Sequence, residues 1–125
     1  MSEIKNILSK YNSIAMIGVS KDLKKTSTVV MKYMQDYGFK VYPVNPSAKG
    51  EKILGEEVYA KITDINKNVD IVDVFRPSEE VYGIAEDAVK IGAKVLWLQL
   101  DISNENAKKL VEENNMEYIE NKCTK

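Results

Sequence analysis

Short apolar runs alternate with longer amphipathic stretches along this 125-residue chain. Three runs, Ile14–Ile17, Ile71–Phe75 and Val95–Leu98, are almost unbroken, which is typical of parallel strands covered by helices on both faces. In chain order the alternating segments are Ile14–Val19, Val29–Tyr37, Lys40–Val44, Val69–Phe75, Val81–Ile91, Lys94–Leu100, Asn104–Asn114 and Glu117–Ile119. The pattern predicts an α/β fold, a single doubly wound, Rossmann-like parallel sheet of about five strands with helices on both faces.

Two glycines punctuate this pattern. Gly38 and Gly92 each follow an amphipathic stretch and precede an apolar run, where a helix end needs a left-handed residue. A further short amphipathic helix is predicted over Ser2–Lys10. The chain has no repeat, no low-complexity tract and no linker rich in Pro, Gly or Ser, so residues 1–125 are predicted to form a single domain.

The charge balance excludes several partners. The chain has 18 Lys plus Arg and 19 Asp plus Glu, a net charge of -1, so no global field draws it to nucleic acid or to a membrane. Any anion site must therefore be local. No apolar run approaches the roughly 20 residues that span a bilayer, and Glu3 and Lys5 stand where a signal peptide would be apolar. We expect a cytoplasmic protein.

The composition also argues against common kinds of catalysis. The chain lacks His and has one cysteine, Cys123, which makes Ser–His chemistry, metal hydrolysis and a CxxC redox pair poor hypotheses. Asp70 and Asp73 flank an apolar strand, but no partner base or nucleophile is visible beside them. We therefore predict no catalytic residues and no metal ligands.

The turn that follows Ile14–Ile17 holds the strongest candidate site. In an open α/β sheet the ligand lies beyond the carboxyl ends of the strands, and Gly18 would let the backbone approach it closely. The following helix would add unpaired N–H groups and the positive end of its dipole. Hydroxyls and cations gather in the same turn: Ser20, Lys21, Lys24, Lys25, Ser27 and Thr28. The pattern predicts a pyrophosphate site, and the alternative is a helix cap beside a solvated lysine loop.

This turn departs from the dinucleotide fingerprint G-x-G-x-x-G. Ser20 and Leu23 stand where the second and third glycines should be. After the second strand, Asn45 and Pro46 replace the acid that would hold a ribose hydroxyl. These two residues predict either a rigid wall beside a nucleotide or an ordinary rigid turn.

Two more strand ends carry candidates. Arg76 follows the buried strand that ends at Phe75, and it could pair with a phosphate or with the acids behind Pro77. Gln99 ends an apolar run with an amide that could meet either a ligand or the backbone. Phe75 and Trp97 are expected to be core residues from their positions alone.

Taken together, these strand ends resemble the CoA-binding domain family of small Rossmann-like proteins, which is similar to the N-terminal domain of succinyl-CoA synthetase alpha subunits. The turn Ile53–Glu56 and the late Cys123 also agree with the family. The matching segments, which cover nearly the whole chain, are Ile14–Ser20, Gly38–Pro46, Val69–Pro77 and Gly92–Gln99.

The resemblance implies a protein that binds coenzyme A or an acyl-CoA and has no assigned catalytic residues. It implies that Gly18, Val19 and Ser20 line the pyrophosphate, with Lys25 and Ser27 reaching phosphates beside Lys24. It also implies that Asn45 and Pro46 border the nucleotide, and that Phe75, Arg76 and Gln99 border the pantetheine. The family commonly has Arg-Pro-Ser in its first loop, whereas this chain has Lys25-Thr26-Ser27, and a lysine lacks the bidentate fork of arginine.

Other functions remain open at this level. An NAD(P)-binding oxidoreductase or redox sensor would share the fold, although the missing glycines and the missing acid oppose it. An interaction subunit with a vestigial crevice, docked on a larger acyl-CoA enzyme, is a third hypothesis; no particular partner enzyme is indicated. Cys123 is either an inert small residue or a thiol that could form a mixed disulfide with CoA.

Overall fold

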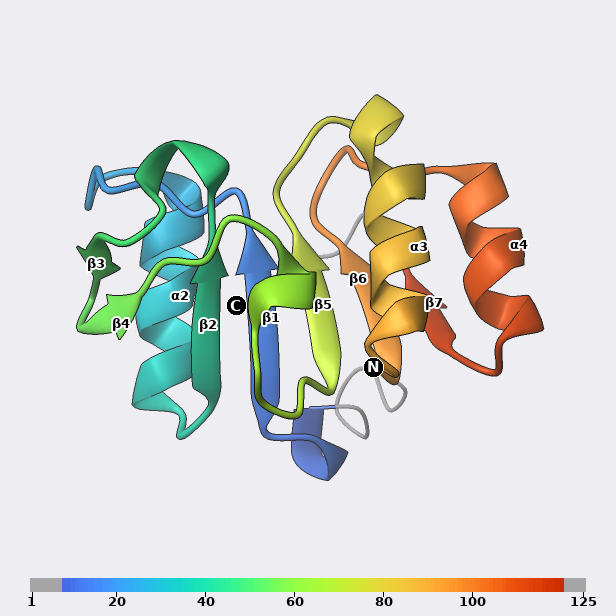
Figure 1. Cartoon of the computed structure of the whole chain (residues 1–125), viewed down its shortest axis with the longest axis horizontal. Helices are drawn as coiled ribbons and strands as arrows, with labels where there is room; N and C mark the ends of the chain where they lie inside the picture. The colour runs from blue at the N-terminus through green and yellow to red at the C-terminus, as the bar shows by residue number, and fades with distance from the viewer. Residues whose placement is uncertain (1–7, 121–125) are drawn as a thin grey trace.

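The computed structural model describes residues 8–120, which form a five-stranded parallel sheet with the order β2-β1-β5-β6-β7 (Figure 1). This architecture confirms the predicted Rossmann-like α/β fold. Across the sheet the strands are β2 (Lys40–Val44), β1 (Ser13–Ile17), β5 (Ile71–Val74), β6 (Val95–Leu98) and β7 (Glu117–Ile119).

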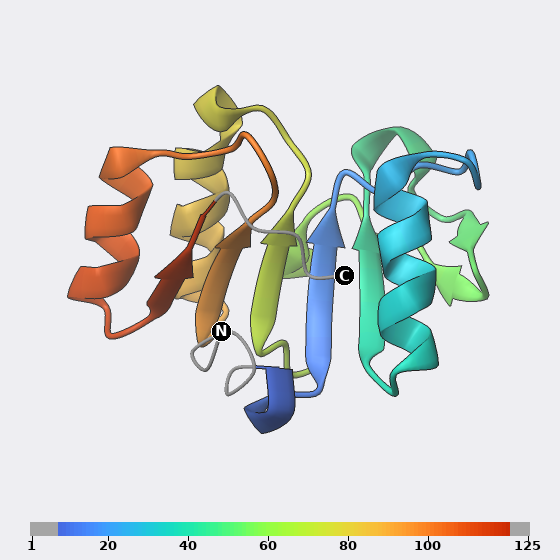
Figure 2. The same ribbon diagram turned by 180° about the vertical axis from the view of Figure 1, so that it is seen from behind.

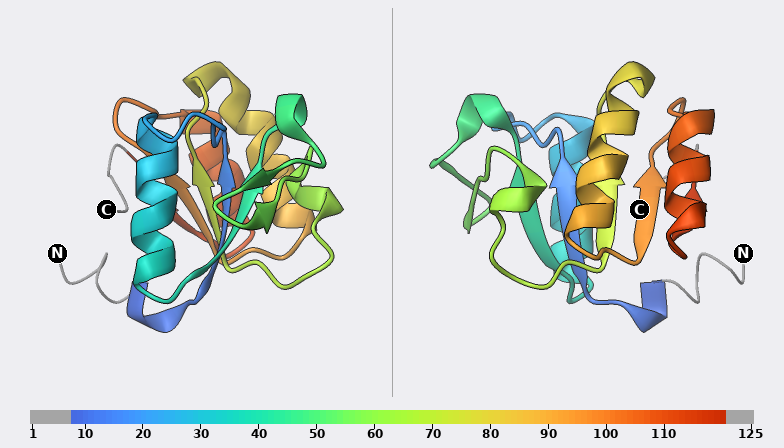
Figure 3. Two further views of the ribbon diagram at one scale, coloured as in Figure 1. Left: turned by 90° about the vertical axis from the view of Figure 1, so that its left-hand side faces the viewer. Right: turned by 45° about the vertical axis from the view of Figure 1, so that its right-hand side comes forward.

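Helices cover both faces of this sheet, as predicted. Helix α2 (Thr26–Asp36) lies on one face, and helices α3 (Val81–Lys90) and α4 (Glu105–Glu113) lie on the other. The view from behind brings α2 forward, beside and in front of β2 (Figure 2). The edge-on view shows the sheet between the two helical layers (Figure 3).

The alternation of side chains along each strand decides which layer they join. Ile14 and Met16 of β1 pack with α2, whereas Ala15 and Ile17 pack on the α3 side. Because successive side chains point to opposite faces, a parallel strand covered on both faces is apolar at nearly every position, and Asp73 of β5 is a buried exception. Trp97 of β6 is fully buried on the α2 side, as expected for a core residue.

The connection from β2 to β5 differs most from a simple helical crossover. It contains two 3-10 turns, η1 (Pro46–Ala48) and η2 (Ile62–Asp64), and a hairpin of β3 (Lys52–Ile53) and β4 (Glu56–Glu57). The chain then returns beside β2, where Tyr59 forms a parallel bridge with Val44. The connection thereby crosses from the α2 side, where Ile53 is buried, to the α3 side, where Ile62 is buried.

The two punctuating glycines have the predicted conformation. Gly38 and Gly92 have φ angles of +94° and +74°, just after α2 and α3. Residues 8–10 are helical, and the rest of the helix predicted over Ser2–Lys10 lies outside the described residues. Among residues 8–120, no helix is both long and apolar enough to cross a membrane.

The strand order reverses between β1 and β5, and this reversal positions the site. From β1 the chain moves outward to β2, and it then returns to the opposite side of β1 as β5. The loop after β1 therefore leads to α2 on one face and the loop after β5 leads to α3 on the other, and open α/β sheets bind ligands at such a point.

Candidate ligand-binding crevice

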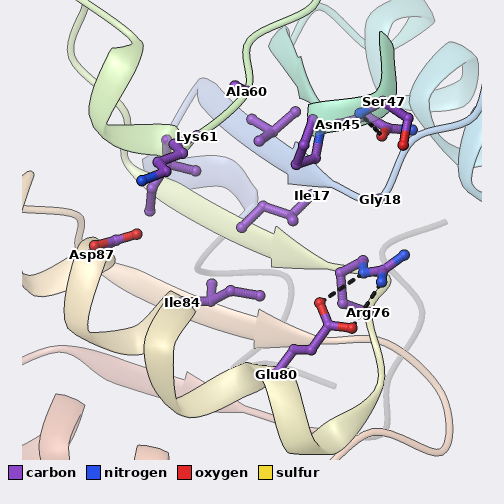
Figure 4. Close-up of a pocket in the computed structure, with 13 residues that line it drawn as sticks. Ile17, Gly18, Asn45, Ser47, Ala60, Lys61, Arg76, Glu80, Ile84 and Asp87 are labelled. Atoms are coloured by element: carbon purple, nitrogen blue, oxygen red, sulfur yellow. Dashed lines mark hydrogen bonds and ion pairs between the residues drawn. The ribbon is translucent and has the colours of Figure 1, made fainter. Parts of the chain in front are cut away.

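A cavity of about 270 Å³ opens beyond the carboxyl ends of β1 and β2, on the α3 side of the sheet (Figure 4). Its floor and walls combine apolar side chains with charges at the rim. Thirteen residues line it: Ile17, Gly18, Val44, Asn45, Pro46, Ser47, Ala60, Lys61, Ile62, Arg76, Glu80, Ile84 and Asp87. Four of the predicted ligand-binding residues are among them, namely Gly18, Asn45, Pro46 and Arg76.

Gly18 is required by packing within the chain itself. Its φ angle is +97°, and a Cβ built on it would lie 2.8 Å from the carbonyl oxygen of Phe75 and 3.1 Å from Cδ of Arg76. The Gly18 N–H donates to the Val44 carbonyl at 2.9 Å. The backbone therefore approaches closely here as predicted, and the neighbour that requires it is the turn after β5.

The hydroxyl-rich turn after β1 is organised by its own hydrogen bonds. The Ser20 Oγ accepts from the Asp22 N–H at 3.0 Å, and Asp22 Oδ1 accepts from the Lys24 N–H at 2.9 Å. The Thr28 hydroxyl donates to the Ser20 carbonyl at 2.7 Å. Lys25 is the N-cap of α2 and makes no side-chain capping bond, so the hydroxyl of Thr28 fastens the turn and does not cap the helix.

Asn45 joins the turn after β2 to the turn after β1. Its Nδ2 donates to the Val19 carbonyl at 2.8 Å, and its Oδ1 accepts from the Ser47 N–H at 2.9 Å. Its main-chain N–H donates to the Tyr59 carbonyl at 2.8 Å. Both ends of the side-chain amide are thus engaged within the chain, which fixes the relative position of two loops at the crevice.

Arg76 lies at the mouth of the crevice and pairs with Glu80. Its Nε and Nη2 donate to the two carboxylate oxygens at 3.0 and 2.8 Å, a bidentate pair one helical turn apart. The pairing raises the pKa of Arg76 and lowers the pKa of Glu80. Both side chains are 46% exposed, so solvent and a ligand can reach them. Of the two partners predicted for Arg76, the acids behind Pro77 are the one seen here.

The remaining walls come from positions that the sequence did not single out. Glu80, Ile84 and Asp87 recur at helical spacing and present one face of the α3 segment to the cavity. Lys61 lines the cavity because the bridge between Tyr59 and Val44 holds the returning connection alongside β2. That bridge is a contact between residues distant in the sequence, and no local sequence pattern predicts it.

Three predicted residues point to the α2 side of the sheet, away from the cavity. Val19 is fully buried there, and Phe75 is partly buried against the same cluster. Gln99 is 5% exposed, and its Nε2 donates to the buried carboxylate of Asp73. The sequence predicts that the Gln99 amide meets either a ligand or the backbone. In the structure it also meets a side-chain carboxylate, that of Asp73.

The other predicted residues belong to the turn before α2. Ser27 is buried in the first turn of that helix, whereas Lys24 and Lys25 are exposed. Ser20 is half-buried and participates in the turn described above. None of these side chains lines the cavity.

The acidic residues singled out in the sequence do not gather into a metal site within residues 8–120. No group of three or more Cys, Asp and Glu side chains in this part of the chain could hold a metal ion. Asp70 accepts from the Ser13 hydroxyl at 3.1 Å, and Asp73 lies in the buried sheet. Cys123 lies outside the described residues, so its predicted roles are untested.

Known proteins with a similar sequence point to one family. The family of CoA binding domains matches residues 12–125. The uncharacterized protein YneT of Bacillus subtilis (strain 168) is 37% identical over 99% of this chain and 90% of its own length. The ADP-forming acetate–CoA ligase of Methanocaldococcus jannaschii is 34% identical over 70% of this chain, which corresponds to 12% of the ligase.

Solved structures agree with this assignment. A hypothetical protein from Pyrococcus horikoshii OT3 superposes with a TM-score of 0.93 at 34% identity, over 98% of this chain and 85% of that one. The dinucleotide-forming acetyl-coenzyme A synthetase 1 of Ca. Korarchaeum cryptofilum, solved with phosphate and ADP, superposes with a TM-score of 0.72 at 26% identity, over 90% of this chain and 26% of that one. The chain therefore belongs to the CoA-binding domain family, and it is homologous to the N-terminal CoA-binding domain of ADP-forming acetyl-CoA synthetases.

Proposed function

We propose that this protein binds coenzyme A or an acyl-CoA in the crevice, as a binding domain without chemistry of its own. The observation that carries the proposal is the position and composition of the cavity. It lies where the strand order reverses, and it sets two cations, Lys61 and Arg76, above apolar walls. A ligand that combines phosphates with less polar groups would suit such a lining.

The size of the cavity fits one part of such a ligand. Ligand pockets usually measure roughly 300–1,000 Å³, so a cavity of about 270 Å³ is slightly smaller than this range. We assign the apolar walls at Ile17, Val44 and Ile62 to an uncharged portion of the ligand. The phosphates would then lie over the rim, toward Gly18 and the exposed lysines before α2.

The turn after β2 favours CoA over a nicotinamide dinucleotide. A dinucleotide enzyme would place an acid here to accept hydrogen bonds from the ribose hydroxyls. Asn45 occupies the position, and both ends of its amide are engaged by Val19 and Ser47. The side chain thus has no carboxylate to offer, and the missing glycines of the preceding turn oppose the same ligand.

The ligase relatives indicate how such a domain could be used. The matched segment corresponds to only 12% of the Methanocaldococcus jannaschii ligase, so the similarity extends to a small part of that enzyme. We propose that any acyl-transfer chemistry on the bound CoA belongs to a separate partner enzyme. We further propose that residues 1–125 form a single domain that acts in the cytoplasm.

Isothermal titration at low and at moderate salt tests the proposal. We expect heat with CoA, none with NAD, and weaker CoA binding at the higher salt because ions screen the phosphate contacts. The Lys61→Ala variant should bind CoA several-fold more weakly, whereas Lys90→Ala, on an exposed part of α3 outside the cavity, should bind like the wild type. Heat with NAD and none with millimolar CoA would overturn the proposal.

A further inference from the structure

The side chain of Arg76 is fixed at two points where it crosses the mouth of the crevice. Its stem passes over Gly18, so close that a Cβ on the glycine would lie 3.1 Å from Cδ of Arg76. Its guanidinium is gripped by both carboxylate oxygens of Glu80, at 3.0 and 2.8 Å. Figure 4 shows the two side chains pointing toward each other beside the cavity that both line.

The hydrogen bonds to Glu80 occupy the N–H donors of Arg76 that a phosphate would need. Arginine recognises carboxylates and phosphates with the same fork of parallel N–H groups, so the two acceptors exclude each other at that edge. A phosphate that enters the crevice must therefore displace the carboxylate or accept only the remaining donors. The two charges are already paired at hydrogen-bonding distance, and their hydrogen bonds raise the pKa of Arg76 and lower the pKa of Glu80.

We infer that Glu80 is a built-in competitor that holds Arg76 until a phosphate group of the ligand displaces it, and so sets the affinity of the crevice. The inference rests on the proposed function, because it assumes that a phosphorylated ligand enters this cavity. Displacement is feasible because both side chains are 46% exposed, and exposed ion pairs are weak. A phosphate monoester offers more acceptor oxygens and more negative charge than the carboxylate that it replaces.

The local structure allows Glu80 to be replaced without loss of the fold. Glu80 is the N-cap residue of α3, but its side chain makes no capping hydrogen bond. The neighbouring Glu79 supplies a matched control. It is also exposed and lies in the same 3-10 turn, but it is not one of the cavity residues, and the ion pair of Arg76 is made with Glu80.

The test compares CoA affinity by isothermal titration in Glu80→Gln, Glu79→Gln and the wild type. Each substitution removes one negative charge from the same turn, so long-range electrostatics change equally. We expect Glu80→Gln to bind CoA about two- to fivefold more tightly, the effect of releasing one exposed ion pair, and Glu79→Gln to change little. Glu80→Ala should act in the same direction as Glu80→Gln.

A second pair of variants ties the effect to Arg76. In an Arg76→Ala background, replacing Glu80 by Gln should have no more effect than replacing Glu79, because the held guanidinium is gone. The competitor role would be overturned if Glu80→Gln and Glu79→Gln bound CoA equally well in the wild-type background, or if Glu80→Gln bound it more weakly. In that case CoA binding by the wild type would still support the proposed function. Absence of CoA binding by the wild type and by Glu80→Gln would overturn both.

Discussion

The turn after β1 and the turn after β5 face each other across the strand-order reversal, but they keep their polar groups in different states. In the first turn, Ser20 and Thr28 are held by hydrogen bonds within the turn. In the second, the exposed guanidinium of Arg76 is held by a single carboxylate at the rim of a cavity. The first turn shapes the crevice, and the second offers a side chain that a ligand can capture.

This contrast separates two kinds of sequence signal. Glycines, hydroxyls and amides at strand ends attract attention in a sequence as candidate ligand-binding groups. In this chain their contacts are mainly with the loops themselves. Cations at strand ends are less distinctive, yet Arg76 is exposed and lines the cavity in which we propose that CoA binds. Substitutions in the two turns should therefore have opposite profiles, with stability lost in the first and affinity lost in the second.

The largest effect is expected at Gly18. Gly18→Ala should lower the free energy of unfolding by about 2–4 kcal/mol, because a φ of +97° strains an alanine and the new Cβ would press on the Phe75 carbonyl. Gly38→Ala is the matched control, with a similar φ of +94° but no atom within 4 Å of the added Cβ. It should cost only about 1–2 kcal/mol in urea unfolding. Equal losses at both glycines would show that the contact with the turn after β5 is unimportant.

Asn45 should show a smaller loss of the same kind. Asn45→Asp keeps the acceptor for the Ser47 N–H but replaces the donor to the Val19 carbonyl by a negative oxygen. We expect a loss of about 1–3 kcal/mol in urea unfolding. The same variant carries the acid typical of a dinucleotide site, yet we expect no heat on titration with NAD. NAD binding by this variant would contradict the structural role given to Asn45.

The second turn should behave in the opposite way. Arg76→Ala should weaken CoA binding about tenfold, the effect of one lost charge-assisted contact of about 1.4 kcal/mol. Its stability should change by less than about 1 kcal/mol, because the pair with Glu80 is exposed. Thermal unfolding and calorimetric titration of the same sample check both statements. A large loss of stability with unchanged affinity would assign Arg76 to the scaffold.

Tyr118 provides a remote reference outside both turns. Its phenol accepts from the Asn104 N–H at 3.1 Å and donates to Glu120 at 2.7 Å, and burial raises its pKa. The folded state thus favours the neutral phenol, so this group stabilises the fold fully below about pH 10, the ordinary tyrosine pKa, and progressively less above it.

Tyr118→Phe should therefore flatten the loss of stability that begins near pH 10, measured from about pH 9 to pH 12. Urea unfolding across that range measures the slope, and CoA binding at neutral pH should remain unchanged because Tyr118 lies outside the cavity. An unchanged alkaline slope would show that the phenol does not contribute to the pH dependence.

The fold could be read from the sequence because its parallel strands are apolar on both faces and its helices end at glycines. Only part of the crevice could be read in the same way. Gln99 and Phe75 lie at strand ends, as predicted, but the alternation of side chains places them on the α2 side, opposite the cavity. The position of a residue along its strand decides which end of the sheet it lies at. Whether that position is odd or even in the strand decides which face its side chain points to.

Lys61 shows a second reason why the lining of the crevice could not be predicted in full from the sequence. It lines the cavity because the chain after the hairpin returns beside β2 through the bridge of Tyr59 with Val44. This pairing joins segments separated by the whole hairpin connection, and its energy depends on the assembled sheet. The hairpin turn itself, with φ angles of 50° at Leu54 and 85° at Gly55, lies within a segment that the family resemblance had singled out.

The most direct test of the account follows the amide NMR signals of the protein as CoA is added. The account predicts that the signals of Gly18, Ser47 and Ile84 move together and saturate, because all three residues line the cavity. The signals of Tyr82 and Leu110, in the groove between α3 and α4, should stay in place. Shifts confined to that groove, or no shifts at millimolar CoA, would contradict binding in the crevice.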